Sequence, residues 1–214
     1  MLLSKEELKQ MFLDVADIWK RNHDRLSEID SKFGDGDHGV TINKIALLIE
    51  KKAKEWTDEQ TMAEFIDALG TGIIAINGGS AGPLYGTMVG GLAIPLGGKT
   101  EIDALTLKAM LRSSLTEMQD ISTAKVGDKT MMDALIPAVI AAEESPNDIP
   151  VILKAAAEAA AQGAKESEQY ISKYGRARSY KEETIGTPDA GAVSTALFFE
   201  GFAHIITNFK EVLA

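Results

Sequence analysis

One short segment, Ile29 to Gly39, contains most of the residues that could perform chemistry in this chain. It places Asp30, Asp35 and Asp37 within eight positions, beside a histidine and three glycines. Glycine permits positive φ and close approach of backbones, so a tight loop can turn the three carboxylates toward one another. Carboxylates are hard ligands, and Mg²⁺ is commonly held by a few of them together with substrate phosphates. The segment predicts such a cation site, with a solvated Asp-Gly turn as the alternative.

A calcium-binding EF-hand loop does not fit the same residues. Counted from Asp30, the third, fifth and twelfth positions hold Lys32, Gly34 and Thr41, where that loop requires acidic or amide side chains. Counted from Asp35, the twelfth position is Ala46. A magnesium site shared with phosphate is therefore the better hypothesis.

Composition limits the class of protein. The chain has 214 residues, no cysteine and a formal net charge of −10. That length suits one domain, and the missing cysteines fit a reducing compartment. The negative charge disfavours binding to nucleic acid or anionic membrane, and we see neither a signal peptide nor an apolar run of membrane-spanning length. We expect a single cytoplasmic domain over residues 1–214, with no nucleic-acid or membrane partner.

Hydrophobic spacing predicts an all-α fold, because apolar residues recur at helical period and no stretch alternates as a strand does. Eight helices are expected, in a barrel or bundle. The first starts at the capping box Ser4-x-x-Glu7 and runs toward Arg25; the third starts at Thr57-x-x-Gln60. Thr100 is expected to cap the fifth and Asp189 the eighth. The second helix is expected to end near residue 56, and the seventh to span roughly 151–174. The stretch 77–87 is expected to open the fourth helix, and 127–133 to lead into the sixth. The expected core includes Leu105 and Ile140.

The loops between these helices share one character, which is glycine combined with Asp, Ser, Thr, Lys or Arg. They include Asn77–Thr87, Gly127–Asp133, Gly175–Tyr180 and the turn at Asp189. If the helices run up and down, alternate loops lie at one end and can form one site. Glycines beside a helix N-terminus suit phosphate, and arginine offers a planar fork for it.

Two other motifs match known catalytic or phosphate-binding patterns only in part. Gly78-x-Ser80-x-Gly82, followed by His204, matches the nucleophile elbow of α/β-hydrolases, but the chain has no predicted strand to precede it. Gly98-Lys99-Thr100 resembles the end of a P-loop, yet Ala93 stands where its first glycine belongs.

Taken together, five motifs strongly resemble the nucleotide-binding L subunit of dihydroxyacetone kinase. They occur in family order across nearly the whole chain: Gly34-Asp-Gly-Asp-His-Gly39, Gly78-Gly-Ser-Ala-Gly-Pro-Leu-Tyr-Gly86, Gly127-Asp-Lys-Thr-Met-Met-Asp133, Gly175-Arg-Ala-Arg178 and Asp189-Ala-Gly-Ala192. The resemblance implies an eight-helix barrel that holds ADP or ATP at one end through two Mg²⁺ ions.

The resemblance also implies roles for individual residues. Asp30, Asp35 and Asp37 would be the metal ligands. The nucleotide would contact the start of the second helix, the glycine loop, the base and ribose region, an arginine and the far wall, which together comprise His38, Gly39, Val40, Thr41, Ser80, Ala81, Ser122, Met131, Arg176, Asp189, Ala190 and Gly191. No role follows for Lys129, Thr130 or the loop 178–188.

By the same resemblance, the substrate dihydroxyacetone is bound on a separate K subunit. A free-standing L chain favours resident ADP that a phosphohistidine M subunit of the phosphotransferase system rephosphorylates. Two alternatives stay open. One is an ATP-consuming subunit of a related short keto-sugar kinase, and the other is a nucleotide-dependent regulatory module that contacts a partner such as a transcription regulator.

Overall fold

The structure is a computed structural model that describes the backbone of residues 1–212 and the side chains of residues 1–206. Within that range the chain forms eight α-helices and two short 3₁₀ helices, and its only extended pairing is a bridge between Leu3 and Ile102. In chain order the elements are α1 (Lys5–Ser31), α2 (His38–Glu55), α3 (Met62–Ile74), α4 (Ala81–Gly91), α5 (Ala104–Ile121), α6 (Met132–Glu144), α7 (Ile149–Glu166), η1 (Ser167–Gln169), η2 (Arg176–Thr184) and α8 (Ala190–Val212).

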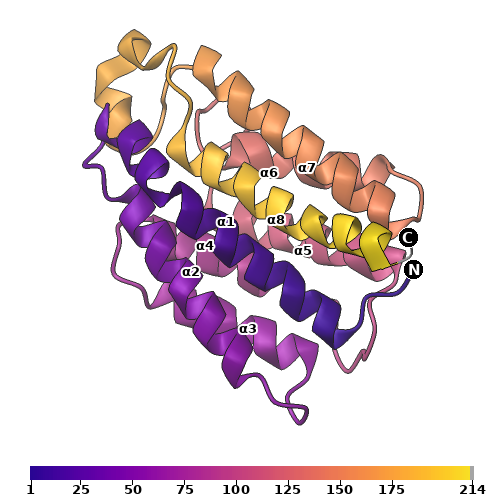
Figure 1. Cartoon of the computed structure of the whole chain (residues 1–214). Helices are drawn as coiled ribbons and strands as arrows, with labels where there is room; N and C mark the ends of the chain where they lie inside the picture. The colour runs from indigo at the N-terminus through magenta and orange to yellow at the C-terminus, as the bar shows by residue number, and fades with distance from the viewer. Residues whose placement is uncertain (213–214) are drawn as a thin grey trace.

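The helices form a closed ring, which confirms the expected all-α barrel (Figure 1). Each helix packs against the next one in the chain, and α8 packs against both α7 and α1. Gly201 lets α8 approach α1 closely, because a Cβ at that position would lie 2.7 Å from Val15 Cα. The loops α1–α2, α3–α4, α5–α6 and α7–α8 consequently lie at the same end of the barrel.

Side-chain caps fix the helix starts at the opposite end. Ser4 and Glu7 form the predicted capping box of α1. Four expected boundaries are wrong. The first helix was expected to run toward Arg25, but α1 ends at Ser31. Thr61 and Glu64 form the capping box of α3, in place of the box expected at Thr57, because Glu64 accepts from the Thr61 backbone N–H. Asp103, not Thr100, caps α5 through a 2.7 Å bond from Thr106 N. Finally, α7 ends at residue 166 rather than 174.

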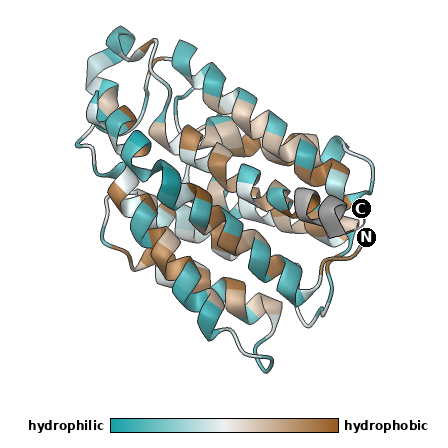
Figure 2. Ribbon diagram, in the orientation of Figure 1, coloured by the Kyte–Doolittle hydropathy of each residue, from teal (hydrophilic) through white to brown (hydrophobic). Residues whose placement is uncertain are grey.

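The core fills the barrel along its length, as the hydrophobic residues in the middle of Figure 2 show. Phe12 meets Phe65 and Phe202 edge-on at ring distances of 5.8 and 5.3 Å, and Trp19 contacts Phe198 at 5.9 Å. Large buried rings dominate the apolar area removed from water, and their edge-on contacts add to it. These contacts join α1 to α3 and α8 and keep the barrel closed.

Two expected core residues lie on the surface. Leu105 is 62% exposed and Ile140 is 43% exposed. Leu105 is the second residue of α5, ahead of its buried stripe, and Ile140 follows the buried Val139 on the outer face of α6. Among the described residues, no helix has both the length and the apolar character that crossing a membrane requires.

Candidate functional site

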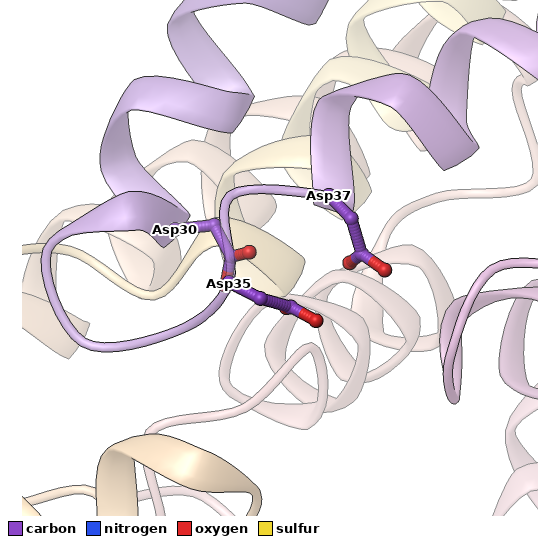
Figure 3. Close-up of side chains that lie close together, drawn as sticks. All are labelled: Asp30, Asp35 and Asp37. Atoms are coloured by element: carbon purple, nitrogen blue, oxygen red, sulfur yellow. The ribbon is translucent and has the colours of Figure 1, made fainter.

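The three aspartates of the acidic loop come together between α1 and α2. Asp30 belongs to the last turn of α1, which runs past its expected end at Arg25, and Asp37 is the residue before α2. One carboxylate oxygen from each of Asp30, Asp35 and Asp37 lies within 4.8 Å of the others. Figure 3 shows the three side chains beside one another on this loop. The spacing is small enough for one cation to contact all three.

Two glycines make this arrangement possible. Gly34 donates from its N–H to the Asp30 carbonyl at 2.7 Å, and a Cβ at Gly34 would lie 2.4 Å from Asp30 Oδ1. Only glycine leaves room there for the Asp30 carboxylate. Gly36 has φ of 74°, a left-handed conformation in which glycine carries no Cβ penalty. The chain can therefore reverse within the few residues that separate the ligands.

The charges in the loop favour a cation. Burial raises the pKa of Asp37, and repulsion from Asp35 and Asp30 raises it further, while Arg176 opposes the shift. Three converging carboxylates repel one another unless a positive charge compensates them. Their oxygens suit Mg²⁺, and the group contains neither sulfur nor imidazole that would select a softer metal. The residues present fit the implied magnesium site.

A cleft of about 430 Å³ opens at this end of the barrel. Its walls come from the four loops whose convergence the sequence predicts, and from the segment at Arg176. The volume falls within the range of small-molecule sites. The lining residues are Ile29, Asp30, Phe33, Gly34, Asp35, Asp37, His38, Gly78, Gly79, Ser80, Ala81, Leu84, Tyr85, Lys129, Thr130, Met131, Ser172, Tyr174, Gly175, Arg176, Ala177, Thr187, Pro188, Asp189, Ala190 and Gly191.

Three helices begin at the cleft after a residue that makes no side-chain cap hydrogen bond, namely α2 after Asp37, α4 after Ser80 and α6 after Met131. In α6 the first N–H, that of Met132, donates to Thr130 Oγ1 instead, so α2 and α4 are the two with free N-termini. At the other end of the barrel, the residues that precede α1, α3 and α5 cap their helices, whereas Asp148 before α7 does not. An uncapped N-terminus presents backbone N–H groups and the positive end of the helix dipole. The starts of α2 and α4 therefore offer an anion the groups that phosphate prefers.

A buried hydrogen-bond network joins the acidic loop to the start of α8. His38 Nε2 lies 2.8 Å from Ser194 Oγ, and Tyr85 OH lies 2.6 Å from the same oxygen. Tyr85 OH also donates toward Gly191 O at 3.0 Å. Burial lowers the pKa of His38 to about 4, so its ring is neutral near pH 7. The network fixes the ring beside Asp37 and holds two walls of the cleft together.

Asp189 forms the inner wall at the start of α8. Its Oδ2 accepts from Ala192 N at 2.8 Å, which confirms the predicted N-cap, and its own N–H donates to Ser167 Oγ at 2.9 Å. Burial raises the pKa of Asp189 to about 7, and the neighbouring Asp133 raises it further, while the Ala192 N–H and Lys129 lower it. The carboxyl group therefore changes charge near neutral pH.

The turn before α6 packs under this wall. Asp133 is fully buried and accepts from Gly127 N and Thr130 N, each at 2.6 Å. Lys129 adopts φ of 59°, a conformation that costs a non-glycine residue about 1–3 kcal/mol, and is 5% exposed. Burial lowers the pKa of Lys129, and Asp189 and Asp133 oppose that shift.

The segment η2 covers the acidic loop from the outside. Arg176 Nη1 lies 2.7 Å from Asp35 Oδ2, and the rings of Phe33 and Tyr180 are 5.2 Å apart. The backbone turns sharply at Lys181, where φ is 50°. Figure 1 shows η2 beside the end of α1. An arginine, an aromatic ring and the carboxylates thus share the mouth of the cleft.

The structure brings most of the predicted site residues into the cleft, but four lie outside its lining. Gly39 packs against α1, where a Cβ would lie 1.8 Å from His23 O, and Val40 is 51% exposed on α2. Thr41 is buried, and its hydroxyl has no hydrogen-bond partner. It lies directly behind Gly78, since a Cβ added at Gly78 would be 2.1 Å from Thr41 Oγ1. Ser122 ends α5, and its Oγ accepts from Ala124 N. The lining includes Asp30, Asp35, Asp37, His38, Ser80, Ala81, Met131, Arg176, Asp189, Ala190 and Gly191.

Sequence reasoning missed several lining residues. Tyr85 and Lys129 lie inside motifs quoted above, but the sequence does not show that the first anchors His38 through Ser194 or that the second is buried. Phe33 occupies the acidic loop itself. Ser172 and Tyr174 follow η1 and carry no sequence signal, because α7 was expected to continue through them.

Comparison with known proteins gives consistent results. The model of the DAK2 domain family matches residues 32–204. The chain is 31% identical over 203 residues to the PEP-dependent dihydroxyacetone kinase 2 ADP-binding subunit of Listeria innocua, covering 94% of this chain and 93% of that protein. It is 32% identical over 198 residues to L-erythrulose kinase of Pectobacterium atrosepticum, covering 91% of this chain. It spans 34% of that kinase's length.

Solved structures show the same fold. The native dihydroxyacetone kinase of C. freundii superposes with a TM-score of 0.73 at 25% identity, covering 94% of this chain and 34% of that one. The same enzyme in complex with AMP-PNP and Mg²⁺ gives a TM-score of 0.72 at 23% identity, over 95% of this chain and 34% of that one. The barrel described above is thus a known arrangement.

Proposed function

The chain belongs to the DAK2 domain family, and from this premise we propose that it is the nucleotide-binding subunit of a kinase for short keto-sugars. The observation that carries the proposal is the position of the Asp30, Asp35 and Asp37 cluster beside the uncapped starts of α2 and α4 in one cleft. Carboxylates for a cation and N–H groups for an anion, side by side, are what a magnesium nucleotide requires.

The proposed assignment of groups follows the cleft. Asp30, Asp35 and Asp37 hold two Mg²⁺ ions, which when bound supply neutralisation of the phosphate charge. The phosphates lie along residues 38–41 and against Ser80 and Ala81. Met131 and Ser122 border the base and ribose, and residues 189–191 form the far wall. Arg176 reaches the nucleotide from η2. Direct contact with Gly39, Val40, Thr41 and Ser122 needs local rearrangement, because all four lie outside the present lining.

Phosphoryl transfer requires positioning and charge stabilisation rather than covalent chemistry from the protein. The chain's own residues supply the positioning. The neutral ring of His38 is fixed by Ser194, and the α2 and α4 N–H groups orient the phosphate oxygens. Asp189 and η2 bound the cleft on two sides, which restricts the access of water to the phosphoryl group.

The proposed phosphoryl acceptor and phosphoryl donor rest on the names of the chain's relatives. The Listeria relative is named as the ADP-binding subunit of a PEP-dependent dihydroxyacetone kinase. We propose dihydroxyacetone, bound on a separate K subunit, as acceptor, and resident ADP rephosphorylated by a phosphohistidine M subunit of the phosphotransferase system. The erythrulose kinases among the relatives favour a second candidate, a four-carbon ketose phosphorylated at the expense of ATP.

The first test is binding of ADP, measured by calorimetry with and without Mg²⁺. Asp30→Asn, Asp35→Asn and Asp37→Asn should each weaken magnesium-dependent ADP binding by about tenfold to a hundredfold, since each removes a ligand charge. Asp24→Asn is the matched control, because that side chain lies on α1 and is 98% exposed. Unchanged affinity in all three variants would reject the proposal.

The second test separates the two candidate modes. Nucleotide released by denaturing the extensively dialysed protein shows whether ADP is resident, and transfer to a panel of trioses and tetruloses with partner subunits identifies the acceptor. Retained ADP supports the PEP-linked mode. An empty protein that binds ATP reversibly supports the ATP-consuming mode.

A further inference from the structure

Lys129 is a buried cation for which the proposed chemistry gives no role. All three hydrogens of its ammonium are used, by the carbonyls of Ser167 at 2.6 Å, Tyr170 at 3.1 Å and Thr187 at 2.5 Å. The residue is 5% exposed, although it lines the cleft. A lysine ammonium has three donors and no acceptor, so this environment satisfies it completely.

The three carbonyls belong to two segments that lie well beyond Lys129 in the sequence. Ser167 and Tyr170 border η1 at the end of α7, whereas Thr187 directly precedes Pro188 and Asp189. Lys129 itself is in the turn that leads to Met131 and α6. The ammonium therefore connects the wall formed by residues 129–131 to the wall formed by residues 187–191, on the inner side of the cleft.

The local backbone supports a specific requirement for this side chain. Lys129 has φ of 59°, a conformation that glycine adopts at lower energy than lysine. The same turn already contains a glycine in such a conformation, Gly127 with φ of 94°. The buried carboxylate of Asp133 holds the turn through Gly127 N and Thr130 N, so the turn does not depend on lysine for its shape. What lysine adds is a positive charge at the point where three carbonyls converge.

We propose that Lys129 is a positioning residue for the nucleotide, whose ammonium sets the separation of the walls 129–131 and 187–191 and so shapes the inner end of the cleft. The inference rests on the proposed function, because it concerns the same site. It predicts that loss of Lys129 affects the inner, nucleotide-binding end of the cleft and leaves the acidic loop unchanged. The acidic loop is held by α1 and α2, so its affinity for Mg²⁺ should not depend on Lys129.

The test compares two affinities in each variant, that for ADP with Mg²⁺ and that for Mg²⁺ alone. Lys129→Met keeps the length of the side chain and removes the charge, and Lys129→Gly removes the side chain while relieving the backbone. Both should bind ADP at least about tenfold more weakly, because three buried carbonyls lose their partner. Both should bind Mg²⁺ alone as the wild type does. Lys173→Met is the matched control, since Lys173 pairs with Asp128 on the same turn and is 56% exposed.

Restoring the ammonium chemically tests whether the charge itself is needed. A general loss of packing would not be reversed by restoring the charge, so ADP affinity would not recover. The chain has no cysteine, so Lys129→Cys can be alkylated at that position alone, in denaturant, and refolded. Bromoethylamine creates a lysine analogue and should restore ADP affinity, while iodoacetamide creates a neutral side chain and should not. Wild type carried through the same cycle controls for refolding.

The outcomes separate the inference from the function on which it rests. Wild-type protein that binds no ADP overturns the proposed function and the inference together. If wild type binds ADP, three results overturn the inference alone: full ADP affinity in Lys129→Met and Lys129→Gly, a parallel loss of Mg²⁺ affinity, or failure of the aminoethylated protein to recover.

Discussion

Arg176 Nη1 lies 2.7 Å from Asp35 Oδ2, so one of the three carboxylates proposed to bind metal is already paired with a cation from η2. The two side chains are 69% and 38% exposed. Exposed pairs of this kind contribute about 0–1 kcal/mol to stability, so the contact is readily exchanged. A metal ion must compete with Arg176 for Asp35, and the released guanidinium then becomes available to a phosphate.

Replacing Arg176 by glutamine should therefore change the two affinities in opposite directions. Without the competing charge, Arg176→Gln should bind Mg²⁺ alone a few-fold more tightly than wild type, since about 1 kcal/mol corresponds to that factor. It should bind ADP with Mg²⁺ more weakly. Calorimetric titrations of both ligands test this, with Arg21→Gln as control, because Arg21 pairs with Asp17 on α1. Loss of both affinities together would contradict the exchange.

Gly39 is predicted to be indispensable for packing, in addition to the phosphate contact proposed for the start of α2. A Cβ at this position would lie 1.8 Å from His23 O and 2.7 Å from Ser27 N, both of them backbone atoms of α1. Gly39→Ala should lower the free energy of unfolding by about 3 kcal/mol or more, as overpacking against backbone does. Chemical denaturation measures the change.

The matched control is another helical glycine. Gly90→Ala places its Cβ 3.9 Å from Gly70 Cα, an ordinary contact. Because alanine is the better helix former, this variant should be neutral or stabilised by about 0.5–1 kcal/mol. Equal destabilisation of the two variants would show that α1 and α2 are not as close as described.

Tyr85→Phe tests the network between the acidic loop and α8. The change removes a buried hydroxyl that contacts Gly191 O, Ser194 Oγ and Thr195 Oγ1, so it should cost about 1–2 kcal/mol of stability. It should also shift the ¹⁵N resonances of the His38 ring, because Ser194 loses a neighbour. The chain has three histidines, so these signals can be assigned by mutation. Tyr174→Phe, which loses one exposed bond to Thr123, should leave stability within about 0.5 kcal/mol.

Asp189→Asn should change how stability depends on pH. The pKa of Asp189 is about 7 in the folded protein against an ordinary value of 3.8. Between those values the unfolded chain loses a proton that the folded protein keeps, so the stability that Asp189 contributes is complete below about pH 4 and is lost as pH rises toward 7. Asparagine does not titrate and still offers an oxygen to Ala192 N. The variant should therefore gain stability relative to wild type as pH rises across that window, by up to about 1.4 kcal/mol for each tenfold fall in proton concentration.

Denaturant titrations at pH steps from about 4 to 8, without ligand, measure that difference. His38 has the opposite effect, since its pKa is lowered to about 4 and stability grows as pH rises above that value. It is present in both proteins and cancels in the comparison. Asp24→Asn should run parallel to wild type. A constant difference between Asp189→Asn and wild type would exclude a raised pKa at Asp189.

Much of the fold could be predicted from the sequence, because it depends on local signals. The apolar stripes and the caps at Ser4 and Asp189 are properties of neighbouring residues, and they gave the helices and their order. The errors occurred where two similar signals competed. Thr57 and Thr61 both begin an apparent capping box, and only the second forms one, because α3 starts at Met62. Leu105 and Ile140 flank buried stripes that end beside them.

The site was predictable where its chemistry lies within one motif. Asp30, Asp35 and Asp37 are close in sequence, and a loop this short keeps them close in space. The contacts between motifs were not predictable, since they depend on how the helices meet. Nothing in the sequence around Lys129 indicates that Thr187 lies 2.5 Å from its ammonium.

The packing of α8 against α1 means that the barrel is closed by the two described helices farthest apart in the chain. While the protein is being synthesised, the face of α1 around Val15 has no Gly201 to cover it, and the acidic loop faces no Asp189. Contacts between such distant residues are the slow ones in folding. The apolar face of α1 therefore stays uncovered until α8 has left the ribosome, and a ligand of the cleft can stabilise only chains that have reached that point.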